Sequence, residues 1–284
     1  MGFNFDQAIE EASSQISQTT IGAIILGQSG AGKSYLLGTL PGKVLYLYTG
    51  GEAHGVKSAG VPGGSVIPVR IDYDKTAPKE VLTEQGTLRP DAAYKRLLNI
   101  LSDVDGIKKQ GFTSIAIDGA TEIENIITST EQWKVGCQTD KGKHNTYAEG
   151  RTTLTMFRPI ITALQHLQIK LGVNYAMSCI LDVKSAGIYG EIEEASPRLS
   201  GYAVAESVIQ QFGDVLVVGR MSKDGVAKHK LQFMTDVTKV SKDLVGNVKK
   251  TLNFAPRVAG LSVADLPPYL DADLKKIIEL KGKK

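Results

Sequence analysis

The sequence predicts an α/β fold in which helices flank a mostly parallel sheet and antiparallel hairpins follow near the C-terminus. Three observations predict it. Apolar runs of strand length alternate along the chain with segments of helical periodicity. Hydrophobic residues make up 42% and charged residues 22% of the 284 positions, a balance that lets a chain bury a core. A glycine-rich turn joins the first apolar run to the helical pattern that follows it.

The predicted strands are continuous apolar runs, which are typical of strands buried on both faces in a parallel sheet. They cover residues 20–26, 44–48, 114–118, 173–180 and 214–218. The predicted helices lie between them, over residues 34–40, 91–101, 121–133, 158–171 and 204–212. A further amphipathic helix is expected over residues 5–16, ahead of the first strand.

Three segments interrupt the alternation and are expected to be loops. Residues 50–64 contain six glycines and are expected to form a mobile loop, and the other two are the polar segments 136–150 and 182–200. Antiparallel hairpins are expected around Asp224-Gly225 and Gly246-Asn247, and a last amphipathic helix over residues 267–284. The expected organisation is an N-terminal helix (1–19), an ATPase core (20–235) and a C-terminal hairpin with a basic helical tail (236–284).

The cysteine content and the N-terminal sequence point to a cytoplasmic protein. The chain has 33 basic and 30 acidic side chains, for a formal net charge of +3, and only two cysteines, too few for a disulfide framework. Its first residues lack the features of a secretory signal, and its apolar runs fall short of the roughly 18 residues that span a bilayer. We expect no membrane association, and the scattered histidines do not suggest a zinc site.

The sequence Gly27-Gln-Ser-Gly-Ala-Gly-Lys-Ser34 matches G-x-x-x-x-G-K-[ST] and stands between a predicted strand and a predicted helix. Glycines in such a turn let successive backbone N–H groups point at phosphate oxygens. Lys33 is expected to reach the β- and γ-phosphates of ATP, and the Ser34 hydroxyl to bind Mg²⁺. The expected nucleotide-binding residues are Gly27, Gln28, Ser29, Gly30, Ala31, Gly32, Lys33, Ser34 and Tyr35.

A second motif, Ser114-Ile-Ala-Ile-Asp118, is an apolar strand that ends in an acid. Asp118 is expected to hold the Mg²⁺ of the bound triphosphate, a role compatible with capping the helix that follows. The next residue is Gly119, not glutamate, so the catalytic base must come from elsewhere. Glu52, after the strand 44–48, is the first candidate to orient the attacking water, with Glu122 and Glu124 as alternatives.

In their order and spacing these motifs resemble the RecA-type ATPases of bacteriophages. Within these, the chain is most similar to the compact "AAA domain" nucleotide-binding proteins found beside recombination and single-strand-annealing genes. The resemblance spans roughly residues 20–235 and rests on the phosphate loop, Leu40-Pro-Gly42, Gly50-Gly-Glu52, Ile115-Ala-Ile-Asp-Gly-Ala-Thr-Glu122, Asn145-Thr-Tyr-Ala-Glu-Gly150, Pro197-Arg-Leu-Ser-Gly201 and Phe212-Gly-Asp214. Such proteins often end the fourth strand in His or Gln, where this chain has Ser178-Cys-Ile180.

The resemblance implies a RecA-like core, ATP hydrolysis at subunit interfaces, a homo-oligomeric ring or filament, and DNA as a partner, in the host cytoplasm if the protein is phage-encoded. Lys228 and Lys230 lie in a basic segment and would share one strand face, so both could act on the γ-phosphate of a neighbouring subunit. A solvated basic surface is the alternative.

We therefore expect an ATP-hydrolysing protein that acts on single-stranded DNA in recombination or replication. The loops 136–150 and 182–200 are the expected DNA contacts, and Trp133 and Tyr147 could stack on bases or serve as packing anchors. A nucleotide-gated regulatory module with little turnover is the first alternative. A P-loop small-molecule kinase is the second, and it is disfavoured because the presumed lid segments contain only three arginines.

Overall fold

The computed structural model describes residues 19–139, 141–186, 191–200, 202–223, 226–233, 256–262, 265–267 and 269–283. The predicted helix over residues 5–16 and the predicted hairpin around Gly246-Asn247 lie outside these residues.

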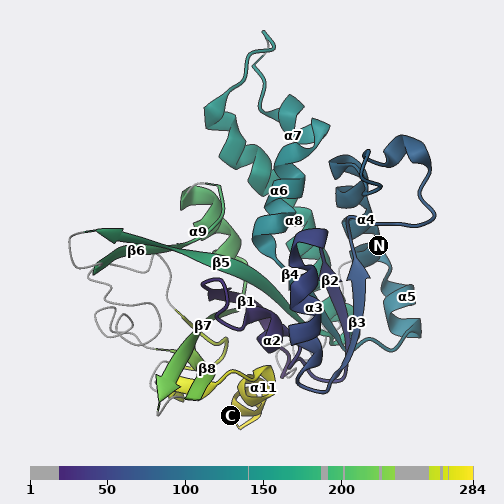
Figure 1. Cartoon of the computed structure of the whole chain (residues 1–284). Helices are drawn as coiled ribbons and strands as arrows, with labels where there is room; N and C mark the ends of the chain where they lie inside the picture. Colours follow the sequence, from purple (N-terminus) through teal and green to yellow (C-terminus); the bar gives the residue numbers. More distant parts are fainter. Residues whose placement is uncertain are drawn as a thin grey trace, which may run out of the picture.

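Within the described residues, nine strands form the sheet at the centre of the molecule (Figure 1). They are β1 (Gly22–Gly27), β2 (Lys43–Tyr48), β3 (Ser65–Arg70), β4 (Ser114–Asp118), β5 (Asn174–Ala186), β6 (Glu191–Pro197), β7 (Asp214–Lys223), β8 (Val226–Gln232) and β9 (Tyr269–Asp271). Their order in space is β3-β2-β4-β5-β1-β7-β8-β9, and β6 pairs with β5.

The strands from β3 to β7 in this order are all parallel to their neighbours, whereas β8, β9 and β6 pair antiparallel. The β7–β8 pair is the hairpin predicted around Asp224-Gly225, although these two turn residues lie outside the description. The predicted fold class, a mostly parallel α/β sheet with antiparallel strands toward the C-terminus, is confirmed.

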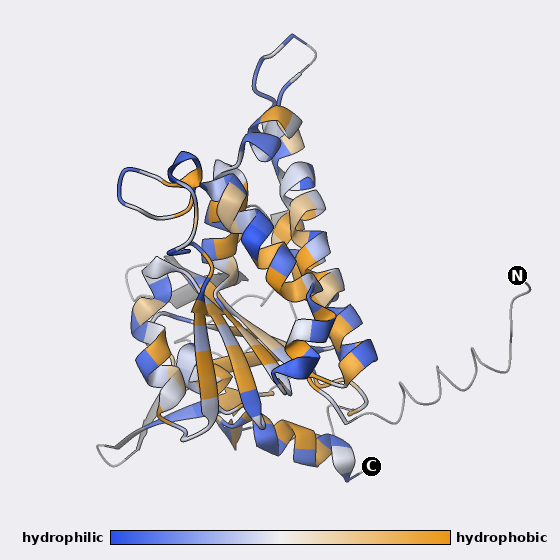
Figure 2. Cartoon of the chain, turned by 90° about the vertical axis from the view of Figure 1, so that its right-hand side faces the viewer, coloured by the Kyte–Doolittle hydropathy of each residue, from blue (hydrophilic) through white to orange (hydrophobic). Residues whose placement is uncertain are grey.

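Both faces of the sheet are buried, as the continuous apolar runs predict. In β1, Ile24 and Leu26 pack into one core, and Ala23 and Ile25 into the other. One face is covered by α4 (Pro90–Ser102), α5 (Val104–Lys109), α6 (Ala120–Ser129), α8 (Thr146–Leu171) and α9 (Tyr202–Gln210). The other is covered by α2 (Lys33–Leu37), α3 (Ala53–Gly60) and α11 (Leu274–Gly282). Figure 2 shows largely hydrophobic strands beside helices of mixed hydropathy.

The prediction of a mobile loop over residues 50–64 is wrong. A 3-10 turn, η1 (Gly50–Glu52), leads directly into α3, and β3 begins at Ser65. Gly55 serves close packing, because a methyl group there would meet the side chains of Asp118 and Ser34. Glycine content alone does not separate a flexible loop from a helix whose backbone must approach its neighbours closely.

Two further expectations also need correction. Among the described residues, most of the segment 182–200 is strand rather than loop, because β5 continues to Ala186 and pairs with β6 through the backbone, which needs no apolar pattern. The helix predicted over residues 121–133 is two helices, α6 and α7 (Glu131–Gly136), divided at Thr130, whose hydroxyl accepts a hydrogen bond from the Trp133 N–H and caps α7.

The long helix starts earlier than predicted, so the non-helical part of the predicted loop 136–150 is shorter than expected. α8 begins at Thr146, where the Asn145 side chain accepts from the Tyr147 N–H, and it carries Pro159 in its interior. Proline favours the first turn of a helix, and the sequence pattern therefore places the helix start near residue 158.

Candidate functional site

The glycine-rich motif forms the turn between β1 and α2, in the strand–turn–helix setting that the sequence predicts. Gly30 has φ 76° and Gly32 φ 94°, both in the left-handed region that favours glycine. A methyl group at Gly32 would lie 2.5 Å from the ring of His229. The turn borders a cavity of about 310 Å³, lined by Ser29, Gly30, Gly32, Lys33, Ser34, Tyr35, Glu52, Ser58, Val61, Asp118, Ile180 and His229.

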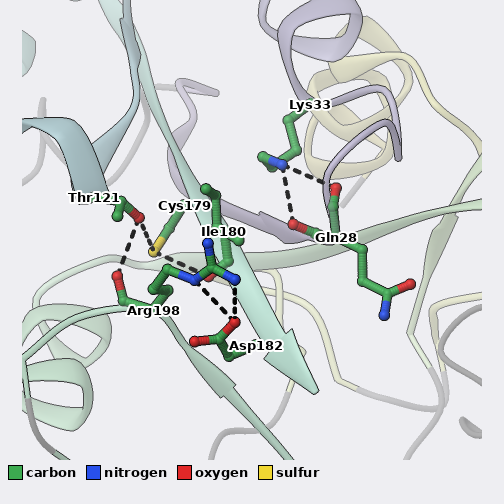
Figure 3. Close-up of polar contacts among 8 residues, drawn as sticks. Gln28, Lys33, Thr121, Cys179, Ile180, Asp182 and Arg198 are labelled. Carbon is green, nitrogen blue, oxygen red and sulfur yellow. Dashed lines mark hydrogen bonds and ion pairs between the residues drawn. The ribbon is translucent and has the colours of Figure 1, made fainter. Parts of the chain in front are cut away.

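Lys33 folds back over its own turn. Its Nζ donates to the carbonyl oxygens of Gly27 and Gln28, at 3.0 Å each, as Figure 3 shows. Burial lowers the pKa of Lys33, and the nearby carboxylates of Asp118 and Glu52 oppose that effect. A half-buried ammonium that contacts neutral carbonyls gains by exchanging them for phosphate oxygens, because hydrogen bonds between two charged groups are stronger.

Asp118 ends β4 and is only 2% exposed. Three hydroxyl groups donate to its carboxylate: Ser34 Oγ to Oδ2 at 2.7 Å, Tyr46 Oη to Oδ2, and Ser178 Oγ to Oδ1. They come from β2 and β5, the two strands that pair with β4, and from α2, which packs against β4. Burial, reinforced by Asp118, raises the pKa of Tyr46, so this phenol keeps its proton and remains a donor.

The Ser34–Asp118 pair fits the Mg²⁺ that the motif implies. Mg²⁺ takes oxygen ligands and is commonly held by one or two protein groups together with substrate phosphates. The Ser34 hydroxyl and the Asp118 carboxylate supply oxygens 2.7 Å apart at the edge of the cavity. These are the two residues predicted for the metal.

Glu52 lies in η1, after β2, and its half-buried side chain lines the cavity. Burial raises its pKa, Asp118 and Glu122 raise it further, and Lys33 acts in the opposite direction. A carboxylate whose pKa is raised toward neutrality is a better general base than an ordinary one.

The two alternative bases occupy other positions. Glu122, on α6, accepts a weak hydrogen bond from Asn125 at 3.4 Å. Glu124 is buried and accepts from the Ser200 N–H at 2.7 Å, and burial raises its pKa. Neither of them is among the described residues that line the cavity.

The middle of β5 and Arg198, the residue that follows β6, lie beside the cavity through Ile180, as Figure 3 shows. The Arg198 N–H donates to the Ile180 carbonyl at 2.7 Å, and the Arg198 carbonyl accepts from Thr121 Oγ1 at 3.1 Å. The Arg198 guanidinium pairs with Asp182 at 2.5 Å. Cys179 is buried with its pKa raised by burial to about 12, so it packs as a neutral thiol.

Lys228 and Lys230 stand outside the cavity. Lys228 is exposed, and Lys230 Nζ forms an ion pair with Asp271 Oδ1 at 2.5 Å. Side chains alternate along a strand, so these two lysines lie on the face of β8 opposite to His229. Their expected action on a neighbouring subunit stays a prediction.

His229 is the site residue that sequence reasoning missed. Its Nδ1 lies 2.8 Å from the Ala31 carbonyl oxygen, and its ring stacks on Tyr35 with centroids 6.1 Å apart and an interplanar angle of 28°. The signal was present: His229 alternates with two lysines and is in phase with Leu231 and Phe233, both buried. Period-two alternation therefore puts His229 on the inner face of β8.

The structure thus combines a mostly parallel α/β sheet with a glycine-rich turn between β1 and α2, and Lys33, Ser34 and Asp118 gather at that turn. No protein-family model matches the chain, and no curated protein sequence matches it. Among solved structures it is similar to the KaiC-like protein PH0186 from the hyperthermophilic archaeon Pyrococcus horikoshii OT3, with 13% identity, a TM-score of 0.39, and 75% of this chain and 78% of that chain covered. Among the described helices, none is both long and apolar enough to cross a membrane.

Proposed function

We propose that the chain binds ATP with Mg²⁺ at the turn between β1 and α2 and hydrolyses it to ADP and phosphate. One observation carries this proposal: Lys33 and Ser34 from α2, Asp118 from β4 and Glu52 from η1 line one cavity. A phosphate-binding cation, oxygen ligands for a divalent ion and a carboxylate of raised pKa are the groups that phosphoryl transfer to water requires.

Each residue has a separate task in this scheme. The N–H groups of the turn and the Lys33 ammonium bind the β- and γ-phosphates, and Lys33 gives up its two carbonyl contacts to do so. Ser34 and Asp118 would hold the Mg²⁺, which neutralises charge on the phosphate oxygens when it is bound. Tyr46 and Ser178 orient the Asp118 carboxylate through their hydroxyls.

Glu52 orients and deprotonates the attacking water. It lies after β2, at the carboxyl edge of the parallel sheet, where groups from neighbouring strands converge on a ligand. Its raised pKa suits a group that must accept a proton near neutral pH.

The test is ATP binding and turnover by Lys33→Ala. Loss of this ammonium is expected to abolish tight ATP binding, because within the described lining Lys33 is the cation that faces the turn. Lys43→Ala is the matched control, since Lys43 Nζ also donates to a backbone carbonyl, that of Gln110, but on an exposed surface. Normal ATP binding by Lys33→Ala would contradict the proposed phosphate site.

The finer proposal is that the protein acts on single-stranded DNA as a homo-oligomer, in recombination or replication. The resemblance to phage RecA-type ATPases supports it, as does the segment between α7 and α8, which extends from the body of the molecule in Figures 1 and 2. Just beyond that segment, Tyr147 is 98% exposed and free to stack on a base. The charges nearby are mixed, with Lys143 close to Glu149, so we expect weak DNA binding that falls steeply with salt.

Turnover measured with and without single-stranded DNA, at two salt concentrations, tests this finer proposal. Stimulation by DNA at low salt is the expected result. ATP binding with little turnover in either condition would favour the nucleotide-gated regulatory module instead.

A further inference from the structure

The cavity has two chemically different ends. Lys33, Glu52 and Asp118 make one end charged. Tyr35, from α2, and His229, from β8, make the other end aromatic. The sheet order separates these ends, because β4, which carries Asp118, and β8 lie on opposite sides of β1.

The aromatic end is held in a defined orientation. A carbonyl oxygen only accepts hydrogen bonds, so the 2.8 Å contact with Ala31 places a proton on Nδ1 of His229. That bond fixes the imidazole ring, and Tyr35 stacks against it at 28°. Both side chains are half-buried, so ring surface remains accessible beside the phosphate-binding turn.

We propose that Tyr35 and His229 hold the nucleoside part of the bound nucleotide by stacking. This inference rests on the proposed function, and it adds the subsite that takes the base and ribose. A nucleoside triphosphate is anionic at one end and flat and aromatic at the other. If its phosphates occupy the turn and the charged end, its nucleoside is directed toward the rings at the opposite end. There the rings can stack on any base, because every base has a flat π-face.

The experiment compares ATP with inorganic tripolyphosphate, which carries the anionic end alone. Binding of each, with Mg²⁺, is measured by calorimetry for the wild type, Tyr35→Ala, His229→Ala and Lys33→Ala. We expect Tyr35→Ala and His229→Ala to weaken ATP binding about 5- to 100-fold, the effect of removing one base-stacking ring, and to leave tripolyphosphate binding unchanged. Lys33→Ala should weaken both ligands.

Two conservative variants and two distant ones sharpen the comparison. Tyr35→Phe keeps the ring and should retain ATP affinity, whereas Tyr147→Ala removes an exposed tyrosine outside the cavity. His229→Phe keeps a ring but loses the bond to Ala31, and it should retain more ATP affinity than His229→Ala. His166→Ala removes a histidine from a separate groove on α8 and should change neither ligand.

Equal loss of ATP and tripolyphosphate binding in His229→Ala would mean that this residue only supports the turn, and it would overturn the inference. Unchanged ATP binding in both alanine variants would overturn it as well. Val61, 69% exposed, lines another part of the cavity, and a loss of ATP binding confined to Val61→Ala would place the nucleoside there instead. Failure of the wild-type protein to bind either ligand would contradict the proposed function itself.

Discussion

At the scale of single residues, Asp118 organises the site. A buried carboxylate is costly unless it is hydrogen-bonded, and Asp118 accepts from the hydroxyls of Ser34, Tyr46 and Ser178. Each hydroxyl belongs to a different element, so the carboxylate also aligns α2, β2 and β5 with respect to β4. Ser178, from β5, donates to the second oxygen of this carboxylate and so helps to orient Asp118 directly.

Glu52→Gln is predicted to keep nucleotide binding and to slow hydrolysis at least about tenfold, because an amide does not accept the proton of water. Single-turnover kinetics with measured ATP affinity checks this. Undiminished turnover would move the base to Glu122 or Glu124.

The raised pKa of Glu52 also predicts two pH effects. The carboxylate is the active form, so wild-type kcat should fall as the pH drops through a value above the ordinary 4.5 of glutamate. A pKa raised in the folded state means that stability is lost as the pH rises through that value. Glu52→Gln should therefore match the wild type in Tm under acidic conditions and exceed it near neutral pH. Glu131→Gln, at a side chain 72% exposed, should follow the wild-type curve.

At the scale of elements, close contact between α2 and α3 shapes the cavity. Gly38 ends α2 with ordinary helical φ and ψ, and a methyl group there would overlap the backbone of Ala59 in α3. This close contact between the two helices holds α3, which carries Ser58, over the turn. α3 follows directly from η1, which carries Glu52. Small residues at this contact thus set the position of the predicted base.

Gly38→Ala is predicted to destabilise the protein by roughly 1–3 kcal/mol, the cost of overpacking a close contact. Gly60→Ala is the matched control on α3, because a methyl group there meets nothing within 4 Å. It should be neutral or stabilise by up to about 1 kcal/mol, since alanine is the better helix former. Denaturant unfolding measures both, and equal stability of the two variants would contradict the packing argument.

At the scale of the whole molecule, α11 ties the C-terminal region to the sheet. Lys281 Nζ donates to Asp214 Oδ2 at 2.8 Å and to the Thr20 carbonyl at 3.0 Å. The side chains of this ion pair are only 11% and 1% exposed. Asp214 also accepts from the N–H groups of Gly22 and Ala259, so one carboxylate joins β1, β7 and the chain beyond β8.

Lys281→Met is predicted to cost about 3 kcal/mol of unfolding free energy, because it leaves the buried Asp214 carboxylate without its cation. Lys276→Met is the control: Lys276 pairs with Asp271 near the surface, where an ion pair contributes about 1 kcal/mol or less. Similar losses of unfolding free energy in the two variants would show that burial of the Lys281–Asp214 ion pair adds nothing to stability.

Assembly gives the second prediction at this scale. If the neighbouring subunit completes the hydrolytic site, turnover per subunit should rise with protein concentration, and the Lys228→Ala/Lys230→Ala double variant should depress it. Mixing that double variant with Lys33→Ala should restore part of the activity, because each supplies the half-site that the other lacks. A fully active monomer, or a mixture without rescue, would rule out action across an interface.

The α/β class, the parallel sheet and the position of the glycine-rich turn between β1 and α2 could all be predicted from the amino-acid sequence. Continuous apolar runs and a glycine turn between strand and helix are local patterns, and each depends on a few consecutive residues. The sequence also predicts that Ser34 and Asp118 lie close together, because the carboxyl ends of parallel strands share one edge of the sheet.

The role of Gly55, the length of β5 and the residue of β8 that meets the turn depend on contacts between distant parts of the chain. Gly38 and Gly55 are required by a neighbouring backbone and by side chains distant in sequence, and no local pattern records such contacts. The charge of the two lysines of β8 led to the prediction that they act at the site. The residue that contacts Ala31, 198 positions earlier in the chain, is His229, which lies between them. Side-chain alternation divides a strand into two faces, but packing of the whole sheet decides which face meets the cavity.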